Sequence, residues 1–301
     1  MITFKQIQYA LAVAKTLHFK QAAEACFISP STLSMAIADM EEQLGIKVFE
    51  RNNKQVIVTP LGQMVLAKAR YIKLQMDDFS KLGQVQAAPL SGPIALGIIP
   101  TVSPYLLPLV LPKLKQSYPD LRLRITEGQS SALIEQVQQG EIDMAILALP
   151  FEVGGLLSFK FWQEDFYYIT HADNMSADKC EIDAAELVQS ELMLLEDGHC
   201  LKDHAMAACK LTSNAQYTMK VSSLSTLIQL VAGNMGSTLV PHMALGQLLN
   251  SNPLLAKAHL NQPSPHREIA FIARPNYSGV ANIERLVEVF TTALKRTMGP
   301  A

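Results

Sequence analysis

The chain has 301 residues, of which 49% are hydrophobic and 17% are charged, and its formal net charge is −2. This composition is typical of a soluble globular protein, and the length predicts two or three folded units. We find no apolar run near the ~20 residues of a membrane span, and no signal-peptide layout at the start. Four cysteines do not suggest a secreted disulfide framework, so we expect a cytoplasmic protein in which any disulfide is transient.

Charge is distributed unevenly along the chain. Residues 1–88 carry 10 Lys and Arg against 7 Asp and Glu, a net charge of +3, whereas residues 89–301 carry 15 against 20, a net charge of −5. This asymmetry favours an N-terminal part that faces nucleic acid and a different task for the remainder.

The first 62 residues predict three short helices and a two-stranded wing. Thr3 caps the first helix, residues 19–25 form the second, and Ser29 caps a third that has Pro30 at its first position. Two short apolar runs flank a polar turn at residues 51–54. This is the plan of a winged helix-turn-helix, whose third helix enters the DNA major groove. The alternative is a small helical subdomain that binds no DNA.

A winged helix-turn-helix of this kind would contact DNA through residues of three sorts. The exposed start of the third helix would reach base edges, the neighbouring hydroxyls would bind phosphate, and the wing would touch the backbone or minor groove. In that order, the candidate residues are Ser31, Thr32 and Met35; Ser29 and Ser34; and Arg51, Asn53 and Lys54.

A longer helix is predicted over residues 60–83, with apolar residues at a 4-3-4-3 spacing for about two heptads. It either packs on its own domain or dimerises. We assign residues 63–89 to a linker helix and hinge. From residue 90 onward, strand and helix patterns alternate, which predicts parallel sheets flanked by helices in two α/β subdomains. Ligands in such folds bind near the carboxyl ends of the strands. The expected strands include 94–99, 121–125, 142–149, 166–170, 192–195, 217–221, 237–240 and 269–273.

The segment from Leu192 to Cys209 carries a possible thiol chemistry. Cys200 lies at or near a helix start, where unpaired N–H groups and the helix dipole favour a thiolate, although Asp203 opposes this effect. If Cys200 and Cys209 share one helix, their Cα atoms lie ~13 Å apart, too far for a disulfide without local unfolding. Two structural core cysteines remain an equally good interpretation. A metal site is a further alternative, with Cys200 and His204 on one helix face and Cys209 or His199 completing it.

A set of N-terminal positions at fixed spacing forms a specific pattern: Phe19, Ala22–Ala23, Ser29, Leu33–Ser34, Ile37, Glu41, Leu44–Gly45, Phe49–Arg51, Thr59 and Gly62. In this pattern the N-terminal residues resemble the DNA-binding domain of LysR-type transcriptional regulators. The chain departs from that family's pattern at Pro30–Ser31. It also departs late in the third helix, where Ala38–Asp39 stand at positions that are usually basic. Base readout is therefore expected to differ. The remainder resembles the same family's periplasmic-binding-protein-like effector domain (90–301), with one subdomain at about 90–163 plus 269–301 and the other at about 164–268.

Within the effector part, the sequence is similar to the hydrogen-peroxide-sensing activators of the family. The resemblance rests on Ser91–Pro93, Ile99–Val102, Pro104–Pro108 and Leu192–Cys209. It implies that Cys200 is the thiol that peroxide oxidises and that Cys209 then closes a reversible disulfide. It further implies that Thr101, Ser130, His199 and Asp203 bind peroxide or move its proton.

The same resemblance implies a regulator of oxidative-stress genes rather than an enzyme. Its effector would be hydrogen peroxide, with no resident cofactor and no metal. The expected partners are operator DNA, RNA polymerase, further copies in a homotetrameric dimer of dimers, and glutaredoxin- or thioredoxin-type reductants. Cys26 and Cys180 are interpreted as structural or incidental. Two alternatives stay open: a LysR-type regulator that responds to a metabolite in the cleft, and a thiol peroxidase.

Overall fold

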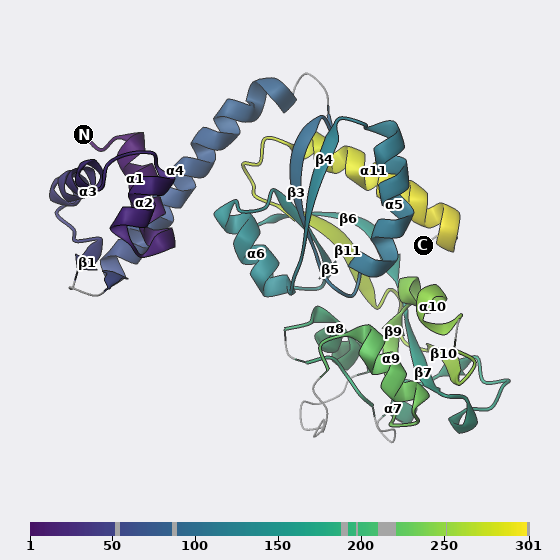
Figure 1. The fold of residues 1–301 in the computed structure, drawn as a ribbon. Coiled ribbons are helices and arrows are strands. Elements are labelled where there is room, and N and C mark those ends of the chain that lie inside the picture. The colour runs from purple at the N-terminus through teal and green to yellow at the C-terminus, as the bar shows by residue number, and fades with distance from the viewer. Residues whose placement is uncertain are drawn as a thin grey trace. The chain divides into compact units, whose positions relative to one another are not determined.

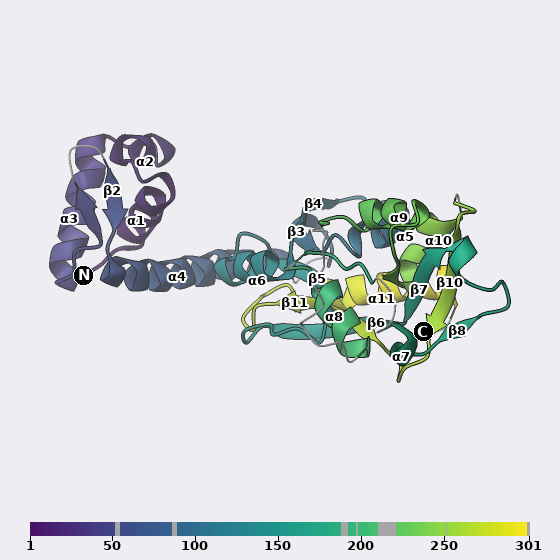
Figure 2. The same ribbon diagram turned by 90° about the horizontal axis from the view of Figure 1, so that it is seen from below.

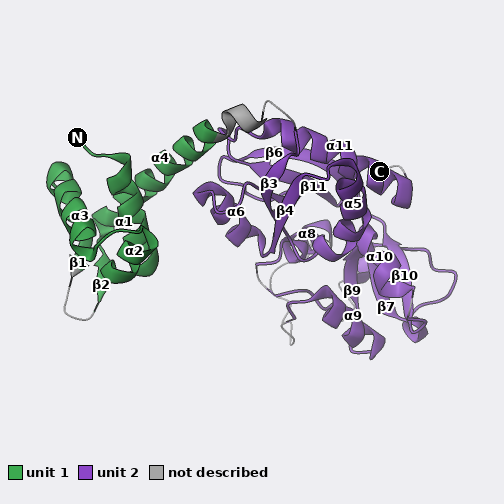
Figure 3. Cartoon of the chain, turned by 45° about the horizontal axis from the view of Figure 1, so that its top comes forward, with its two compact units in different colours: residues 1–84 green, residues 85–301 purple. Residues whose placement is uncertain are grey.

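The computed structural model describes residues 1–51, 55–85, 89–187, 192–196, 198–209, 221–250 and 252–299. The chain divides into two compact units, Met1–Gln84 and Val85–Ala301, which Figure 3 colours separately. None of the described helices has both the length and the apolar character needed to span a membrane.

Unit 1 begins with the three predicted helices, α1 (Phe4–Thr16), α2 (Phe19–Ala25) and α3 (Pro30–Leu44), which pack on one another (Figure 2). Their bounds confirm the capping signals in the sequence. Thr3 and Gln6 form a capping box at α1, and Ser29 accepts a hydrogen bond from the Thr32 N–H at α3. Apolar side chains from all three helices form one core, including Ala10, Ala22, Ala23, Leu33 and Ile37.

The wing consists of β1 (Phe49–Arg51) and β2 (Val56–Val58), which pair antiparallel as predicted. A buried carboxylate ties it to α3. Glu41 Oε1 accepts the N–H groups of Val48 and Phe49 at 2.9 and 3.0 Å, and Glu41 Oε2 pairs with Lys47 Nζ at 3.0 Å. Helix α4 (Pro60–Val85) follows the wing. Glu41 therefore ties the start of the wing to the third helix, in addition to the packing of Val48 and Phe49 in the core of unit 1.

Unit 2 contains two sheets. The larger has the strand order β4-β3-β5-β11-β6, formed by β3 (Gly92–Ile98), β4 (Leu121–Glu127), β5 (Met144–Leu149), β6 (Leu157–Glu164) and β11 (Arg267–Ala273). Figure 1 shows α6 (Ser130–Gln139) on one side of this sheet and α5 (Ser103–Ser117) with α11 (Val280–Met298) on the other.

The smaller sheet has the order β8-β10-β7-β9. Its strands are β7 (Phe166–His171), β8 (Glu181–Ile182), β9 (Thr238–Pro241) and β10 (Leu255–Leu260). The helices of this subdomain are α7 (Ala184–Leu187), α8 (Cys200–Cys209), α9 (Leu224–Ala232) and α10 (His242–Leu249), and a single 3-10 turn spans Ala172–Asn174.

The structure corrects the expectation of parallel sheets, because both sheets are mixed. Strands β3, β4 and β5 are parallel, but β11 runs antiparallel to β5 and β6, and β7 runs antiparallel to β9 and β10. The reason is the connectivity, since β6 leads out of the larger sheet and β11 returns to it after the whole second subdomain. The expected strand at 192–195 is reduced to isolated bridges at Leu192 and Leu195, and residues 217–220 lie outside the described part.

The chain crosses between the two sheets twice, and polar side chains join the crossings. Asp165, on the first crossing, accepts a hydrogen bond from the Ser264 hydroxyl at 2.6 Å and pairs with His259 Nε2 at 3.0 Å. His266, on the second crossing, accepts the Phe166 N–H at 2.8 Å. Segments that are a hundred residues apart in the sequence thus form one connection between the subdomains.

Replacing Glu41 by alanine should loosen the wing. Two buried backbone N–H groups would lose their acceptor, which costs about 1–3 kcal/mol each when no replacement forms. Hydrogen exchange followed by mass spectrometry should show faster exchange in peptides that contain Val48 and Phe49. The exposed neighbour Glu42 offers the matched control, since Glu42→Ala removes a carboxylate without touching these groups. Equal protection in both variants would contradict this assignment.

Candidate functional site

Helix α8 begins at Cys200 and ends at Cys209. At a rise of ~1.5 Å per residue, the two Cα atoms at its ends lie ~13 Å apart, whereas a disulfide needs roughly 4.4–6.8 Å. Cys200 is a free thiol and only 2% exposed. The side chain of Cys209 lies outside the described atoms. A bond between these cysteines therefore requires α8 to unwind.

The Cys200 thiol is held mainly in its protonated form. Burial raises its pKa above the ordinary value, and the charge of Asp203 acts in the same direction. The Ser130 hydroxyl, the Arg267 guanidinium and a backbone hydrogen bond from Ala148 oppose this rise by favouring the thiolate. The helix start thus does not lower the pKa overall, because the energetic cost of burying a charge outweighs the groups that stabilise it.

Arg267 supplies the positive charge of the site, and sequence reasoning missed it. Its side chain is fully buried and pairs with Glu164 through Nε at 2.8 Å and Nη2 at 2.6 Å. The guanidinium also donates to the Thr101 hydroxyl and to the Thr101 carbonyl, both at 3.3 Å. A charged residue just before the apolar run 269–273 could have indicated that Arg267 is buried. Its partner Glu164 lies about a hundred residues away, so the ion pair could not be found from local sequence.

Two hydroxyls predicted to bind peroxide are buried beside these groups. Thr101 is 3% exposed, and its oxygen accepts from Arg267, so its own O–H hydrogen remains available to donate. Ser130 is 1% exposed, and its hydroxyl makes no well-formed hydrogen bond within the described part of the chain, although it lies near enough to favour the Cys200 thiolate. Burying a hydroxyl that has no hydrogen-bond partner costs free energy unless a bound ligand supplies the partner.

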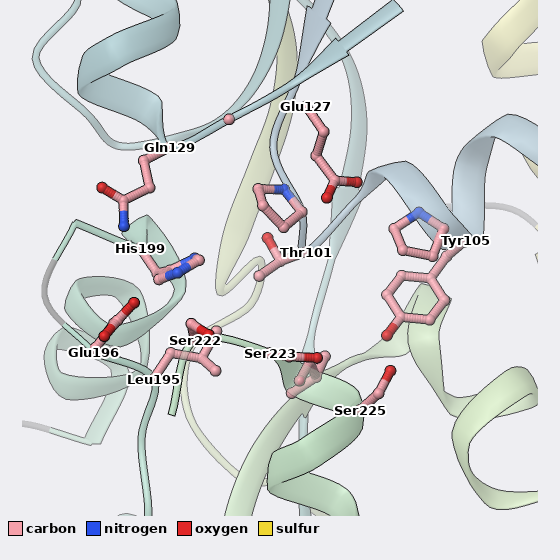
Figure 4. A pocket seen from close by; sticks show the side chains of 14 residues that line it. Thr101, Tyr105, Glu127, Gln129, Leu195, Glu196, His199, Ser222, Ser223 and Ser225 are labelled. Atoms are coloured by element: carbon pink, nitrogen blue, oxygen red, sulfur yellow. The ribbon is translucent and has the colours of Figure 1, made fainter. Parts of the chain in front are cut away.

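A cavity of about 340 Å³ with a mixed polar and apolar lining lies next to this site, between residues of the two subdomains. Thr101, Gln129 and His199 project toward the same space in Figure 4. The cavity opens where β3 and β4 end, which agrees with the rule for ligand sites in α/β folds. Tyr105 also lines it, and burial raises the pKa of this phenol to about 12, so it stays protonated at neutral pH. The remaining lining includes Glu127, Glu196 and Ser222–Ser225.

The histidines and Asp203 take different places around the thiol. His199 lines the cavity, and burial lowers its pKa, so the neutral imidazole is favoured. His204, which the sequence suggested only as a metal ligand, is buried, and its Nε2 lies 2.7 Å from the Pro150 carbonyl oxygen. Asp203 is exposed. In the described residues, no group of three His, Cys, Asp or Glu side chains is arranged to hold a metal ion.

Most of the residues predicted to contact DNA at the start of α3 lie on one exposed, hydroxyl-rich surface. The Ser29 hydroxyl lies 2.8 Å from the Ser31 hydroxyl and 2.7 Å from the Thr32 hydroxyl, and all three residues are exposed. Met35 is 71% exposed, and Ser34 is half-buried. Asn53, Lys54 and the side chain of Arg51 were also predicted to contact DNA, but they lie outside the described part of the wing.

Comparison with known proteins identifies both units. The LysR substrate binding domain family matches residues 87–295, and the bacterial regulatory helix-turn-helix protein, lysR family, matches residues 4–63. The HTH-type transcriptional regulator EstR of Acinetobacter baylyi is 37% identical over 276 residues, which cover 90% of each chain. The DNA-binding transcriptional dual regulator OxyR of Escherichia coli is 31% identical and covers 95% of this chain and 94% of its own.

Among solved structures, a hydrogen-peroxide-bound mutant of OxyR from Corynebacterium glutamicum is similar over most of its length. Its sequence is 32% identical, the TM-score is 0.68, and the match covers 98% of this chain and 94% of that one.

Replacing Arg267 by methionine should destabilise unit 2 by about 3–5 kcal/mol, because Glu164 would remain buried without a counter-charge. The double variant Glu164→Gln, Arg267→Met removes both charges and should recover a large part of this loss. Denaturant unfolding can be followed through Trp162, the single tryptophan, which is 4% exposed. If the double variant were no more stable than the single one, the ion pair would not be the cause.

Proposed function

Since the chain belongs to the LysR family of bacterial transcriptional regulators, we propose that it senses hydrogen peroxide through Cys200 and Cys209 and controls oxidative-stress genes. The observation that carries this proposal is the buried Cys200 thiol, set beside the Arg267 guanidinium and the Ser130 hydroxyl, which has no well-formed hydrogen bond among the residues that the structure describes. Similarity to proteins named OxyR supports it from an independent direction.

The first step is oxidation of Cys200 by peroxide. The thiolate sulfur attacks one peroxide oxygen, the O–O bond breaks, and the leaving hydroxide takes a proton to become water. The product is a sulfenic acid on Cys200. Ser130 and Thr101 are placed to orient the peroxide, and Arg267 stabilises the thiolate that attacks. His199, on the cavity wall, is the group through which the proton reaches the leaving oxygen.

The second step joins the two ends of α8. The Cys209 sulfur attacks the sulfenic sulfur, the S–O bond breaks, and water leaves as the disulfide forms. The Cα atoms joined by a disulfide lie much closer together than the two ends of α8, so the helix must unwind before the bond can form. Buried side chains of the helix itself, among them Leu201 and Ala205, then lose their packing. The surface of the effector domain changes with them, which is the signal transmitted to DNA.

The assembly and partners follow from this role. A helix-turn-helix protein reads two half-sites as a dimer, and we propose a dimer of dimers whose DNA-binding heads change spacing on oxidation. An activator of this kind acts on RNA polymerase in the cytoplasm, and glutaredoxin- or thioredoxin-type reductants would reset the disulfide.

A second candidate function is a response to a small polar metabolite. The 340 Å³ cavity, with its hydroxyls and two carboxylates, favours it, as does similarity to EstR, whose name mentions no peroxide. In that case the cysteines would be structural. The thiol chemistry of Cys200 separates the two candidates.

The decisive test is peptide mapping under non-reducing conditions after one equivalent of hydrogen peroxide. We expect a Cys200–Cys209 linkage that forms within seconds and is absent from Cys200→Ser. The exposed Cys180 gives a matched control, because Cys180→Ser should leave the linkage intact. Two free thiols after peroxide would refute the sensor and leave the metabolite-responsive regulator.

Reactivity of Cys200 should rise with pH through and beyond pH 9. Burial raises the pKa of this thiol above its ordinary value of 9.0, so the thiolate fraction at neutral pH lies below that of a free cysteine and grows about tenfold per pH unit. Iodoacetamide labelling of Cys200, quantified by mass spectrometry between pH 6 and 10, measures this. A plateau reached by pH 8 would mean that Arg267 and Ser130 outweigh burial.

A further inference from the structure

The outward face of α3 has an unusual composition. Leu33, Ile37 and Met40 face the core of unit 1, and the residues at the opposite helical positions are Ser31, Met35, Ala38 and Glu42. These follow a 4-3-4 spacing and therefore form one stripe along the helix. Met35 lies at its centre and is 71% exposed. The part of the helix that a major groove would meet is thus centred on an apolar side chain.

This helix has no basic residue along its whole length. The segment from Pro30 to Leu44 contains three acidic residues and neither lysine nor arginine. The Asp39 carboxylate accepts hydrogen bonds from Gln6 Nε2 at 2.6 Å and from Gln43 Nε2 at 2.9 Å, which hold it in place. Glu41 is buried against the wing, and Glu42 is exposed.

The absence of cations limits how α3 can read bases. The commonest specific contact in a major groove is Arg or Lys with the O6 and N7 acceptors of guanine, and this helix cannot make it. Carboxylates repel phosphates, so the acidic second half of the helix is kept from the backbone and contacts concentrate at its first two turns. Those turns contain the Ser29, Ser31 and Thr32 hydroxyls and the side chain of Met35.

We propose that Met35 is a specificity-determining residue that reads the 5-methyl group of thymine by apolar contact. Thymine is the base that presents a methyl group in the major groove. The flexible, polarisable thioether chain of methionine adapts to such a surface. This inference rests on the DNA-binding role in the proposed function and concerns which base the protein selects. It is independent of the thiol chemistry, which lies in the other unit.

The test begins with the full chain and a pool of random-sequence DNA duplexes at one fixed salt concentration, from which the bound sequences are selected. The selected duplex is then synthesised with thymine or with deoxyuridine, which lacks only the methyl group, at each position in turn. We expect one or two positions per half-site at which deoxyuridine weakens binding about fourfold, the value of one buried methyl group. In Met35→Ala this ratio should fall to about one.

Two further variants sharpen the comparison. Met35→Gln keeps the length of the side chain but replaces its apolar end, so it should also lose the preference for the methyl group. Met235→Ala removes an exposed methionine from unit 2 and should keep the full preference. An unchanged methyl dependence in Met35→Ala overturns the inference while DNA binding stands. A failure to select any sequence overturns both the inference and the regulator itself.

Discussion

The buried ion pair between Glu164 and Arg267 is the constraint on which the effector unit depends. Both side chains are fully shielded from solvent, and they lie at the two points where the chain crosses between its sheets. Glu164 Oε2 also accepts the N–H of Met243 at 2.8 Å, in the first turn of α10. Burying two charges is costly unless they are paired and hydrogen-bonded, and here Thr101 and the Met243 N–H add hydrogen bonds to the ion pair across the subdomain boundary.

The ion pair between Glu164 and Arg267 also links the fold of this unit to the Cys200 thiol. Arg267 reaches Thr101 in the loop after β3, and its charge partly offsets the burial that raises the pKa of Cys200. A thiol kept protonated in the resting fold reacts little with incidental electrophiles. The neighbouring Ser130 hydroxyl makes no well-formed hydrogen bond within the described residues, and in the proposed function it binds the peroxide. If Cys200 senses peroxide as proposed, its selectivity for a small oxidant over a large electrophile would follow from burial rather than from a low pKa.

The two units differ in where they place positive charge. The effector unit buries the Arg267 cation, which pairs with Glu164 and partly opposes the rise in the pKa of the Cys200 thiol. The recognition helix of the DNA-binding unit has no cation at all and carries exposed carboxylates toward its end. Phosphate attraction must therefore come from basic residues elsewhere in unit 1, and α3 is left to read base edges with hydroxyls and an apolar side chain. Affinity and base selection are thus assigned to different elements of the same small domain.

Local signals in the sequence were sufficient for the helices and for several strands. Thr3, Ser29 and Pro30 define helix starts through the local backbone, and α2 has the bounds expected from the sequence. The spacing of Cys200 and Cys209 already implied that one intact helix cannot hold their disulfide. These conclusions needed only interactions within about ten residues.

Tertiary structure decided what depends on distant parts of the chain. The mixed strand directions, the crossings joined by Asp165 and His266, and the pairing of Glu164 with Arg267 all unite segments about a hundred residues apart. The pKa of Cys200 likewise depends on residues that are distant in the sequence. Sequence identified a favourable helix start, but burial by residues from other elements reversed the net direction. Periodicity and capping report local backbone preference, whereas desolvation and charge pairing arise only when distant side chains pack together.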